Sequence, residues 1–268
     1  MSHPILNVAI GAAEKAGEIM RRQLPNVSTI PVTRKARNDY VSEVDRACEA
    51  EIVREIKRFY PDHAILAEES GASGDSDYLW IVDPLDGTSN YLHGIPHFAV
   101  SIAVQHKGRT EQAVVFDPMR DELFTAQRGG GAYLNQQRMR VSPRNGLEGA
   151  ILATAFPFRQ RQHMKPYLNI FNRLWDQAED FRRAGTASLD LAYVANGRVD
   201  GFFEIGLKPW DVAAGALLVR EAGGVVGDFD GHDDVENRDT LVAASYKIMT
   251  ELRRIIEPRW KAAKANAG

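Results

Sequence analysis

Residues 80–91 read WIVDPLDGTSNY, and the fold and the chemistry of the chain are best approached from this stretch. The apolar run Trp80–Val82 predicts the end of a buried strand, and two aspartates, Asp83 and Asp86, follow it. Proline, Asp-Gly and serine are common turn and cap residues, so an acidic turn is one interpretation. Two neighbouring carboxylates beside a buried strand also repel each other unless a cation lies between them. The stretch therefore predicts either a turn or a cation site.

Length, composition and charge exclude several classes of protein. The chain has 268 residues, which suits one large domain or two closely packed ones. A composition of 44% hydrophobic and 26% charged residues is ordinary for a globular protein. Because the net charge is -3, no basic field indicates nucleic acid, and direct nucleic-acid binding is not expected. The basic runs at 34–37 and 159–161 are short and are interpreted as solvated faces.

The cysteine content and the lack of long apolar stretches predict a cytoplasmic protein. Cys48 is the single cysteine, so an intrachain disulfide is excluded, as fits a reducing compartment. The first twenty residues carry charges at helical spacing and no apolar core of signal-peptide length. No stretch approaches the length of a membrane span, so no membrane association is expected.

Hydrophobic periodicity predicts a chain of mixed helices and strands. Helices are expected at 5–20 and 43–59, and strands at 64–67, 78–82, 98–105, 111–117, 122–126 and 132–134. After a polar connection at 142–149, strands are expected at 151–155, 179–182, 199–205, 225–226 and 241–244, and helices at 163–175, 186–196, 211–222 and 246–262. This pattern predicts an α+β fold with helices layered on sheets. It also predicts two parts, residues 1–145 with the acidic motif and residues 146–268 completing the site.

Other acids also stand where predicted elements begin or end. Glu68 follows the strand at 64–67, Asp45 lies in the first turn of the second helix, and Asp211 opens an apolar helix. Each one alone is explained as a helix cap or a solvated strand end. Together with Asp83 and Asp86 they form a set of oxygen ligands that suits a hard divalent cation such as Mg²⁺. Histidine and cysteine offer no competing site, since HExxH and paired cysteines are absent.

Several separated motifs, in order along nearly the whole chain, resemble those of the inositol monophosphatase family of Mg²⁺-dependent sugar phosphatases. They are WIVDPLDGTSN at 80–90, WDVAAG at 210–215 continuing to EAGG at 221–224, AEES at 67–70, Val44-Asp45, Gly185-Thr186-Ala187 and Phe203-Glu204. HFAVSIAV, FRRAG, ASLDLAYVANGRVDGFFEIGL and PWD are most similar to the bacterial SuhB-type members. Ser89 departs from the threonine of many members but keeps the hydroxyl.

The resemblance implies a layered αβαβα sandwich that binds two or three Mg²⁺ ions per active site. The implied metal ligands are Glu68, Asp83, the Leu85 carbonyl, Asp86 and Asp211, with Asp83 bridging two ions. Thr88 and Asp45, with Glu68, are the implied catalytic residues that orient the attacking water. Residues implied to bind substrate are Asp86, Gly87, Thr88, Ser89, Gly185, Thr186, Ala187, Glu204 and Asp211, and Gly87–Ser89 would start a helix whose N–H groups face the phosphate. The implied reaction is hydrolysis of inositol monophosphate to inositol and phosphate, with sensitivity to Li⁺.

Three alternatives stay open at this point. A fructose-1,6-bisphosphatase would need added basic residues for the second phosphate, and a 3′-phosphoadenosine nucleotidase would need a nucleotide pocket. SuhB-type proteins are also associated with antitermination of ribosomal RNA transcription, which implies antitermination factors and RNA polymerase as partners. The resemblance further implies a homodimer, with Arg182-Arg183 in an element linked to oligomerisation, although a surface strand edge is the favoured explanation of these arginines.

Overall fold

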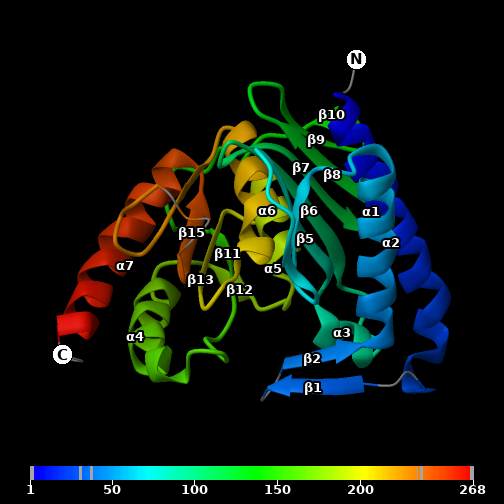
Figure 1. The fold of residues 1–268 in the computed structure, drawn as a ribbon. Helices are drawn as coiled ribbons and strands as arrows, with labels where there is room; N and C mark the ends of the chain where they lie inside the picture. Colours follow the sequence, from blue (N-terminus) through cyan, green and yellow to red (C-terminus); the bar gives the residue numbers. More distant parts are fainter. Residues whose placement is uncertain (1–2, 30–31, 37–38, 234, 236–237, 266–268) are drawn as a thin grey trace.

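The computed structural model describes residues 3–29, 32–36, 39–233, 235 and 238–265. Five layers follow one another across the molecule, as Figure 1 shows: a helix pair, an eight-stranded sheet, a second helix pair, a five-stranded sheet and a third helix pair. The predicted αβαβα sandwich is therefore confirmed. Three apolar clusters fill the spaces between the layers, so the eight-stranded and the five-stranded sheet are covered on both faces.

The helices are α1 (Pro4–Gln23), α2 (Glu43–Phe59), α3 (Thr88–Leu92), α4 (Met164–Trp175), α5 (Ala187–Ala195), α6 (Pro209–Glu221) and α7 (Tyr246–Ala265), with 3-10 helices at Leu24–Thr29 and Arg161–His163. The strands are β1 (Val32–Ala36), β2 (Asp39–Ser42), β3 (Ala64–Ala67), β4 (Gly71–Ser73), β5 (Tyr78–Asp86), β6 (Ala99–His106), β7 (Arg109–Asp117), β8 (Glu122–Gln127), β9 (Gly131–Leu134), β10 (Gln137–Arg138), β11 (Ile151–Thr154), β12 (Asp180–Arg182), β13 (Gly201–Ile205), β14 (Val225–Gly227) and β15 (Thr240–Ala244).

The outer helices α1 and α2 cover one face of the large sheet. Apolar residues at helical spacing on α1, including Ala9, Ala12 and Ala16, are buried against the sheet. Helix α2 begins at a capping box in which Ser42 accepts the amide hydrogen of Asp45 while the Asp45 carboxylate accepts the amide hydrogen of Ser42. This cap fixes Asp45, one of the predicted site residues, in the first turn of α2.

The large sheet has the strand order β10-β9-β8-β7-β6-β5-β3-β4, with β5 parallel to β3 and antiparallel to β6. Helices α5 and α6 cover its second face, and the same apolar cluster reaches the small sheet. The small sheet has the order β12-β11-β13-β15-β14, and α4 and α7 pack on its outer side (Figure 1). The middle cluster joins residues before 145 to residues after 146, and the division of the chain at that point stays a prediction.

Most expected elements are present with ends shifted by a few residues, and two differences matter for the site. Strand β5 does not end at Val82 but continues through both aspartates to Asp86, because β6 keeps pairing with it. The expected loop at 70–77 contains β4, and β1, β2 and β10 had not been predicted as elements, whereas α3 begins at Thr88, where the family resemblance implies a helix. Very short strands and a one-turn helix carry too few residues to show a hydrophobic period.

Candidate active site

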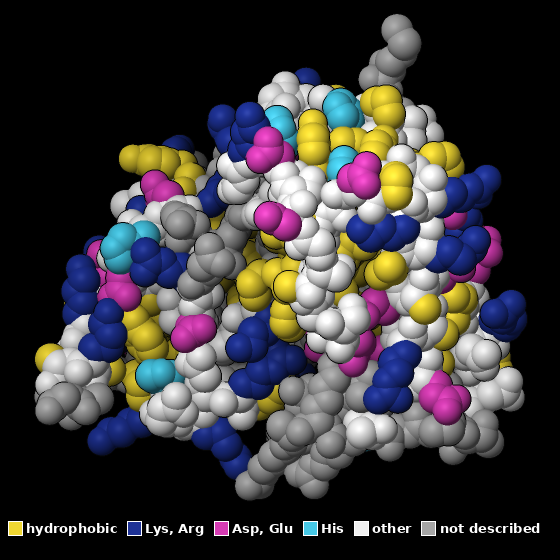
Figure 2. Space-filling model, in the orientation of Figure 1, with side chains coloured by type: hydrophobic (Ala, Val, Ile, Leu, Met, Phe, Trp, Pro, Cys, Tyr) yellow, Lys and Arg dark blue, Asp and Glu magenta, His cyan; other side chains and the backbone are white. Residues whose placement is uncertain are grey.

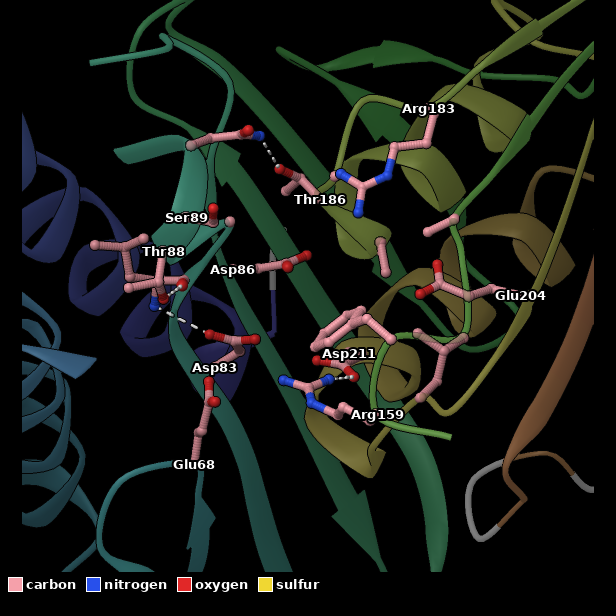
Figure 3. Close-up of a pocket in the computed structure, with 18 residues that line it drawn as sticks. Glu68, Asp83, Asp86, Thr88, Ser89, Arg159, Arg183, Thr186, Glu204 and Asp211 are labelled. Atoms are coloured by element: carbon pink, nitrogen blue, oxygen red, sulfur yellow. Dashed lines mark hydrogen bonds and ion pairs between the residues drawn. The ribbon is translucent and has the colours of Figure 1, made fainter. Parts of the chain in front are cut away.

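A cavity of about 260 Å³ lies between β5 and α3 on one side and the elements after residue 150 on the other (Figure 3). All predicted site residues except Asp45 line it. The lining consists of Glu68, Asp83, Leu85, Asp86, Gly87, Thr88, Ser89, Asn90, Ala155, Phe158, Arg159, Arg183, Gly185, Thr186, Ala187, Glu204, Leu207 and Asp211. The cavity therefore brings together residues that are more than a hundred positions apart in the sequence.

A bulge in β5 turns Asp83 and Asp86 toward the same side of the sheet. In the register with β6, Asp83 pairs with Ser101 and Asp86 pairs with Ala99, so β5 contains one residue more than its partner. Residues three apart in a regular strand would point to opposite faces. Because of the bulge, Leu85 joins the core on the α1 side, while Asp86 reaches Ser188 at the start of α5. The turn expected between the two acids is thus a bulge within a continuing strand.

Three buried carboxylates meet at the floor of the cavity. Oxygen atoms of Asp83, Asp86 and Asp211 all lie within 4.8 Å of one another. Burial, and then the charges of Glu68, Asp86 and Asp211, raise the pKa of Asp83 well above its usual value. Burial also raises the pKa of Asp86 and of Asp211 to about 6. Hydrogen bonds from Ser188 act in the opposite direction on the pKa of Asp86, and the charge of Arg159 does so on the pKa of Asp211. Such mutual repulsion is relieved when a cation is shared.

The carboxylate oxygens of these acids and their hydrogen bonds are compatible with a bound divalent cation. Asp83 accepts a hydrogen bond on Oδ1 from the Leu85 amide, at 3.0 Å. Asp86 accepts hydrogen bonds on Oδ2 from the amide and the hydroxyl of Ser188, at 2.7 and 2.6 Å. Oxygen ligands at a buried site with this much negative charge are what Mg²⁺ prefers. The chemistry of the donor set therefore agrees with a magnesium site.

Thr88 lies at the start of α3 and connects the acidic floor to α2. Its hydroxyl is 2.8 Å from Asp45 Oδ1 and 3.1 Å from the Leu85 carbonyl oxygen, and it can donate to either. The second oxygen of Asp45 accepts the amide and the hydroxyl hydrogens of Ser42, at 2.8 and 2.5 Å. Burial raises the pKa of Asp45, and the hydrogen bonds from Ser42 and Thr88 act in the opposite direction. Asp45 does not line the cavity and is connected to it by the hydrogen bond from Thr88.

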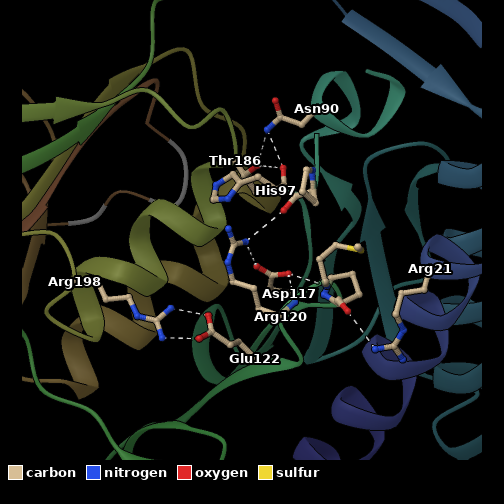
Figure 4. Close-up of polar contacts among 11 residues, drawn as sticks. Arg21, Asn90, His97, Asp117, Arg120, Glu122, Thr186 and Arg198 are labelled. Carbon is tan, nitrogen blue, oxygen red and sulfur yellow. Dashed lines mark hydrogen bonds and ion pairs between the residues drawn. The ribbon is translucent and has the colours of Figure 1, made fainter. Parts of the chain in front are cut away.

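Hydrogen bonds across the cavity fix the segment 185–187 (Figure 4). The Asn90 side chain donates to the carbonyl oxygens of His97 and Ala184, at 2.8 and 2.9 Å, and the Thr186 hydroxyl donates to the same His97 oxygen at 3.0 Å. Gly87 has φ of 96°, and a Cβ there would lie 2.6 Å from Thr186 Oγ1, so only glycine fits. The close approach holds the two halves of the cavity in one arrangement.

Glu204 lies on β13 across the cavity from α3 and is buried. Burial, followed by the charges of Asp211, Asp190 and Asp86, raises its pKa well above the usual value, and Arg183 counteracts this. Asp190 on α5 is a further buried acid of this region that sequence reasoning missed, and one of its oxygens has no hydrogen-bond partner among the described residues. Its pKa is also raised, by burial and then by the charge of Asp86.

Two arginines of the cavity were not predicted as site residues. Arg159 was interpreted as part of a solvated run, but its guanidinium is 3.6 Å from Asp211 Oδ2. The neighbouring residues Arg182 and Arg183 lie in different places. Arg182 is exposed on the edge strand β12 and forms an ion pair with Asp180 at 2.5 Å, whereas Arg183 lines the cavity. The sequence does not indicate which of the two arginines lines the cavity, because their side chains take different directions only where the chain leaves the strand. The basic run at 34–37 includes Arg37, which lies outside the described residues.

On the face shown in Figure 2, acidic and basic side chains are interspersed, with one group of Lys and Arg side chains near the centre of the view. Among the helices within the described ranges, none has the length and apolarity needed to cross a membrane.

Comparisons with known proteins agree with this geometry. The profile of the inositol monophosphatase family matches residues 1–262. Nus factor SuhB of Escherichia coli K12 is 53% identical over 249 residues, covering 92% of this chain and 93% of that protein. The crystal structure of the extragenic suppressor protein suhB from Bartonella henselae has a TM-score of 0.92 at 44% identity and covers 95% of this chain and 99% of its own. Inositol monophosphatase from Anabaena has a TM-score of 0.84 at 38% identity, with 95% of each chain covered. The chain therefore belongs to the inositol monophosphatase family.

Proposed function

We propose that the protein hydrolyses inositol monophosphate to inositol and phosphate in an Mg²⁺-dependent reaction. The observation that carries this proposal is the cluster of Asp83, Asp86 and Asp211, whose carboxylate oxygens lie within 4.8 Å of one another at the floor of a cavity. Names of relatives and structural neighbours include both inositol monophosphatase and Nus factor SuhB. Family membership supports a phosphatase, and the substrate and the metal belong to the proposal.

The metal site would be built by the three aspartates, Glu68 and the Leu85 carbonyl oxygen. Two or three Mg²⁺ ions, when bound, supply Lewis-acid activation of water and neutralise the charge that develops on the leaving oxygen. Uncatalysed hydrolysis of a phosphate monoester is among the slowest reactions known, so the site must lower the barrier by roughly 20 kcal/mol or more. The part of this barrier reduction that the ions do not supply has to come from residues of this chain that position the substrate and the water.

Thr88 and Asp45 orient the attacking water. The Thr88 hydroxyl hydrogen points toward Asp45 Oδ1 or the Leu85 carbonyl oxygen, so a lone pair of Oγ1 remains to accept a hydrogen bond from the water. Asp45 keeps this orientation because Ser42 holds its other oxygen. The pair therefore aims the water at phosphorus without forming a covalent intermediate with the enzyme.

The inositol ring would lie toward Glu204 and the segment Gly185–Ala187. Both line the end of the cavity that faces away from Glu68 (Figure 3). Glu204 accepts a hydrogen bond from a ring hydroxyl, and backbone groups of the segment complete the contact. Asp86, Gly87, Thr88, Ser89 and Asp211 surround the phosphate.

A second function is proposed on the strength of the relatives' names. Several relatives that are 51–54% identical are named Nus factor SuhB. We infer that the protein also takes part in transcription antitermination in the cytoplasm, with antitermination factors and RNA polymerase as partners. The test is a pull-down from lysate with and without Mg²⁺. Failure to retain RNA polymerase or antitermination factors in either condition would reject this second function.

Phosphate release across a panel of inositol, sugar and nucleotide phosphates tests the first function. We expect the highest kcat/KM on inositol 1-phosphate, loss of activity in EDTA and its recovery on adding Mg²⁺, because an all-oxygen site holds Mg²⁺ only loosely. Inhibition by tens of millimolar Li⁺ is expected from the family resemblance. Full activity in chelator would exclude the metal mechanism, and a preference for adenosine 3′,5′-bisphosphate would replace the proposed substrate.

A further inference from the structure

A positively charged side chain, Arg159, lies against the acidic floor of the cavity. Its Nη1 is 3.6 Å from Asp211 Oδ2, and a dashed line marks this ion pair in Figure 3. The charge of Arg159 lowers the pKa of Asp211 against burial and acts in the same direction on the pKa of Asp86. Two of the three carboxylates proposed to hold the metal are therefore within the field of this guanidinium.

The local sequence holds the guanidinium at this position. Phe158 and Arg159 are consecutive in the segment that follows β11, and both line the cavity. The guanidinium carbon lies 4.8 Å from the centre of the Phe158 ring, a distance at which a cation is attracted to the face of an aromatic ring. The Arg159 side chain is 28% exposed, so solvent and salt screen its charge only in part. The Phe158 ring and the Asp211 carboxylate therefore fix a positive charge beside the proposed metal site.

The direction of the Asp211 carboxylate is set by a different group. Asp211 lies in the first turn of α6, and its Oδ2 accepts the amide hydrogen of Lys208 at 2.8 Å. The 3.6 Å between Arg159 Nη1 and the same oxygen is longer than a hydrogen bond. Neither of these two contacts involves Asp211 Oδ1. Arg159 therefore contributes charge to this ligand, whereas the Lys208 amide contributes its orientation.

A positive charge beside a metal ligand has two opposite effects on the affinity for a cation. It favours the ionised carboxylate, which is the form that binds a metal, and it repels the cation itself. A bound cation already keeps its carboxylate ligands ionised, so the first effect adds little once the ion is in place. The repulsion acts on both charges of a divalent ion. The net effect of Arg159 is therefore expected to be a weaker hold on the ion.

We propose that Arg159 sets the metal affinity of the site by lowering it, so that divalent ions bind loosely enough to enter and leave while the enzyme works. This inference rests on the proposed phosphatase function and extends it to the control of its metal. Arg159 acts on the ion through its charge and takes no part in cleavage of the ester bond. The competing explanation is that Arg159 orients Asp211 and thereby strengthens metal binding.

Two substitutions of Arg159 separate charge from orientation. Arg159→Gln keeps a hydrogen-bond donor and removes the charge, whereas Arg159→Lys keeps the charge and removes the planar guanidinium. The probe is Mn²⁺, which suits the same oxygen ligands as Mg²⁺ and is counted by the electron paramagnetic resonance signal of the free ion. We expect Arg159→Gln to bind Mn²⁺ about tenfold more tightly than the wild-type protein, the order of magnitude of a unit charge acting at short range in a partly solvated site. Arg159→Lys should bind Mn²⁺ as the wild-type protein does.

Two further variants serve as controls. Arg161 is the same residue type two positions later, is exposed and does not line the cavity, so Arg161→Gln should leave the affinity for Mn²⁺ unchanged. Asp83→Asn should lose the Mn²⁺ binding that responds to Arg159. If that binding persists unchanged in Asp83→Asn, the ion is held elsewhere and the proposal is overturned.

The sign of the change in affinity decides between the two explanations. A gain of affinity in Arg159→Gln cannot come from a misfolded protein, and circular dichroism shows whether each variant is folded. Weaker Mn²⁺ binding by folded Arg159→Gln would show that Arg159 orients Asp211, and the proposal would be overturned. Equal affinities in the wild-type protein, Arg159→Gln and Arg159→Lys would overturn it as well.

The Mn²⁺ measurement needs no turnover, so the proposed reaction and this inference can fail separately. In the active enzyme, the Mg²⁺ concentration that gives half-maximal phosphate release should fall by about the same factor in Arg159→Gln as the dissociation constant for Mn²⁺. If the protein hydrolyses no phosphate but Arg159→Gln still tightens Mn²⁺ binding, the reaction fails while the role of Arg159 stands. If it hydrolyses inositol phosphate and the affinity for Mn²⁺ does not rise in Arg159→Gln, the inference alone fails.

Discussion

Asp83 and Glu204 are both buried acids of one cavity, and their surroundings assign them different tasks. Asp83 lies at the floor within 4.8 Å of two other carboxylates, whereas Glu204 is placed on β13 across the cavity. Composition alone cannot distinguish these residues. Their positions can, since three carboxylates with oxygens within 4.8 Å of one another suit a cation, whereas Glu204 lies outside that group, where a carboxylate can accept a hydroxyl hydrogen bond.

Substitution of each acid by its amide tests this assignment. Asp83→Asn should lower turnover by orders of magnitude on every phosphate, because it weakens the whole metal site. Glu204→Gln should lower kcat/KM on inositol 1-phosphate about 10- to 150-fold, which corresponds to the roughly 1.5–3 kcal/mol of a charged hydrogen bond. It should have a small effect on p-nitrophenyl phosphate, which lacks that hydroxyl. Equal losses on both substrates in both variants would show that Glu204 is not a specificity residue.

His63 gives the stability of the protein a dependence on pH that is separate from the active site. Its Nδ1 accepts a hydrogen bond from Trp80 Nε1 at 3.0 Å, and its ring stacks on Tyr78. Burial, and then the charge of Lys57, lower the pKa of His63, while Asp62 acts in the opposite direction. A lowered pKa means that the neutral ring is favoured in the folded state, and protonation removes the acceptor for Trp80.

The contribution of His63 is therefore present above the ordinary histidine pKa of about 6.5 and is lost as the pH falls through the lowered folded value. We expect the urea midpoint of the wild-type protein to fall between pH 7 and pH 5. His63→Phe keeps a ring for stacking but does not titrate, so its midpoint should change less over the same interval. An identical change in the two proteins would mean that other groups cause the pH dependence.

At the scale of elements, Ser42 at the start of α2 is expected to affect both stability and catalysis. Ser42 caps the helix and at the same time holds the Asp45 oxygen that faces away from Thr88. The bulge of β5 has a similar double role, since it continues the pairing with β6 and turns Asp86 toward α5. Local backbone features at the start of α2 and within β5 thus determine the directions of these site residues.

Removal of the cap should affect both properties. Ser42→Ala is expected to lower the free energy of unfolding by about 1 kcal/mol, the usual effect of losing an N-cap. It should also lower kcat on every substrate, since Asp45 loses its hydroxyl partner and Thr88 is less well oriented. Ser42→Thr retains an N-cap hydroxyl and serves as the control. Full activity in a destabilised Ser42→Ala would separate the cap from catalysis and refute the positioning role of Asp45.

At the scale of the whole molecule, two covered sheets enclose a central helix layer, and the cavity opens where the two halves of the chain meet. Helices α5 and α6 belong to the shared apolar cluster and begin beside the cavity, so the core and the site are built from the same elements. Asn90 and Thr186 add polar links between the halves. Movement of one half of the chain relative to the other would therefore disturb both the apolar core and the cavity.

The oligomeric state is the prediction that belongs to this scale. From the family resemblance we expect a homodimer at micromolar concentration, measured by sedimentation velocity with and without Mg²⁺. Sedimentation as a monomer over that range would contradict the expectation, and it would leave the phosphatase proposal intact because the lining residues of the cavity come from one chain.

The sequence by itself was sufficient for the layered fold, most element positions and the acids of the site. Helical and strand periods are local properties, and Asp83, Asp86 and Asp211 are recognisable because each lies in a distinctive local motif. The assignment of roles to these residues stays a prediction until the variants are measured. That these acids share one cation site was expected from their positions at the ends of elements, and the individual metal ligands were implied by the resemblance.

Only the tertiary structure decided which side chains face the cavity. Nothing in WIVDPLDGTSNY indicates that β5 continues through a bulge, because the pairing that maintains it comes from β6. Arg159 and Arg183 resemble ordinary surface arginines in the sequence, and Asn90 stands in an expected turn. Packing then brings Arg159 to Asp211, 52 positions away, and Asn90 to Ala184, 94 positions away. Local patterns carry the period of an element, whereas the direction of one side chain depends on long-range packing, which leaves no period in the sequence.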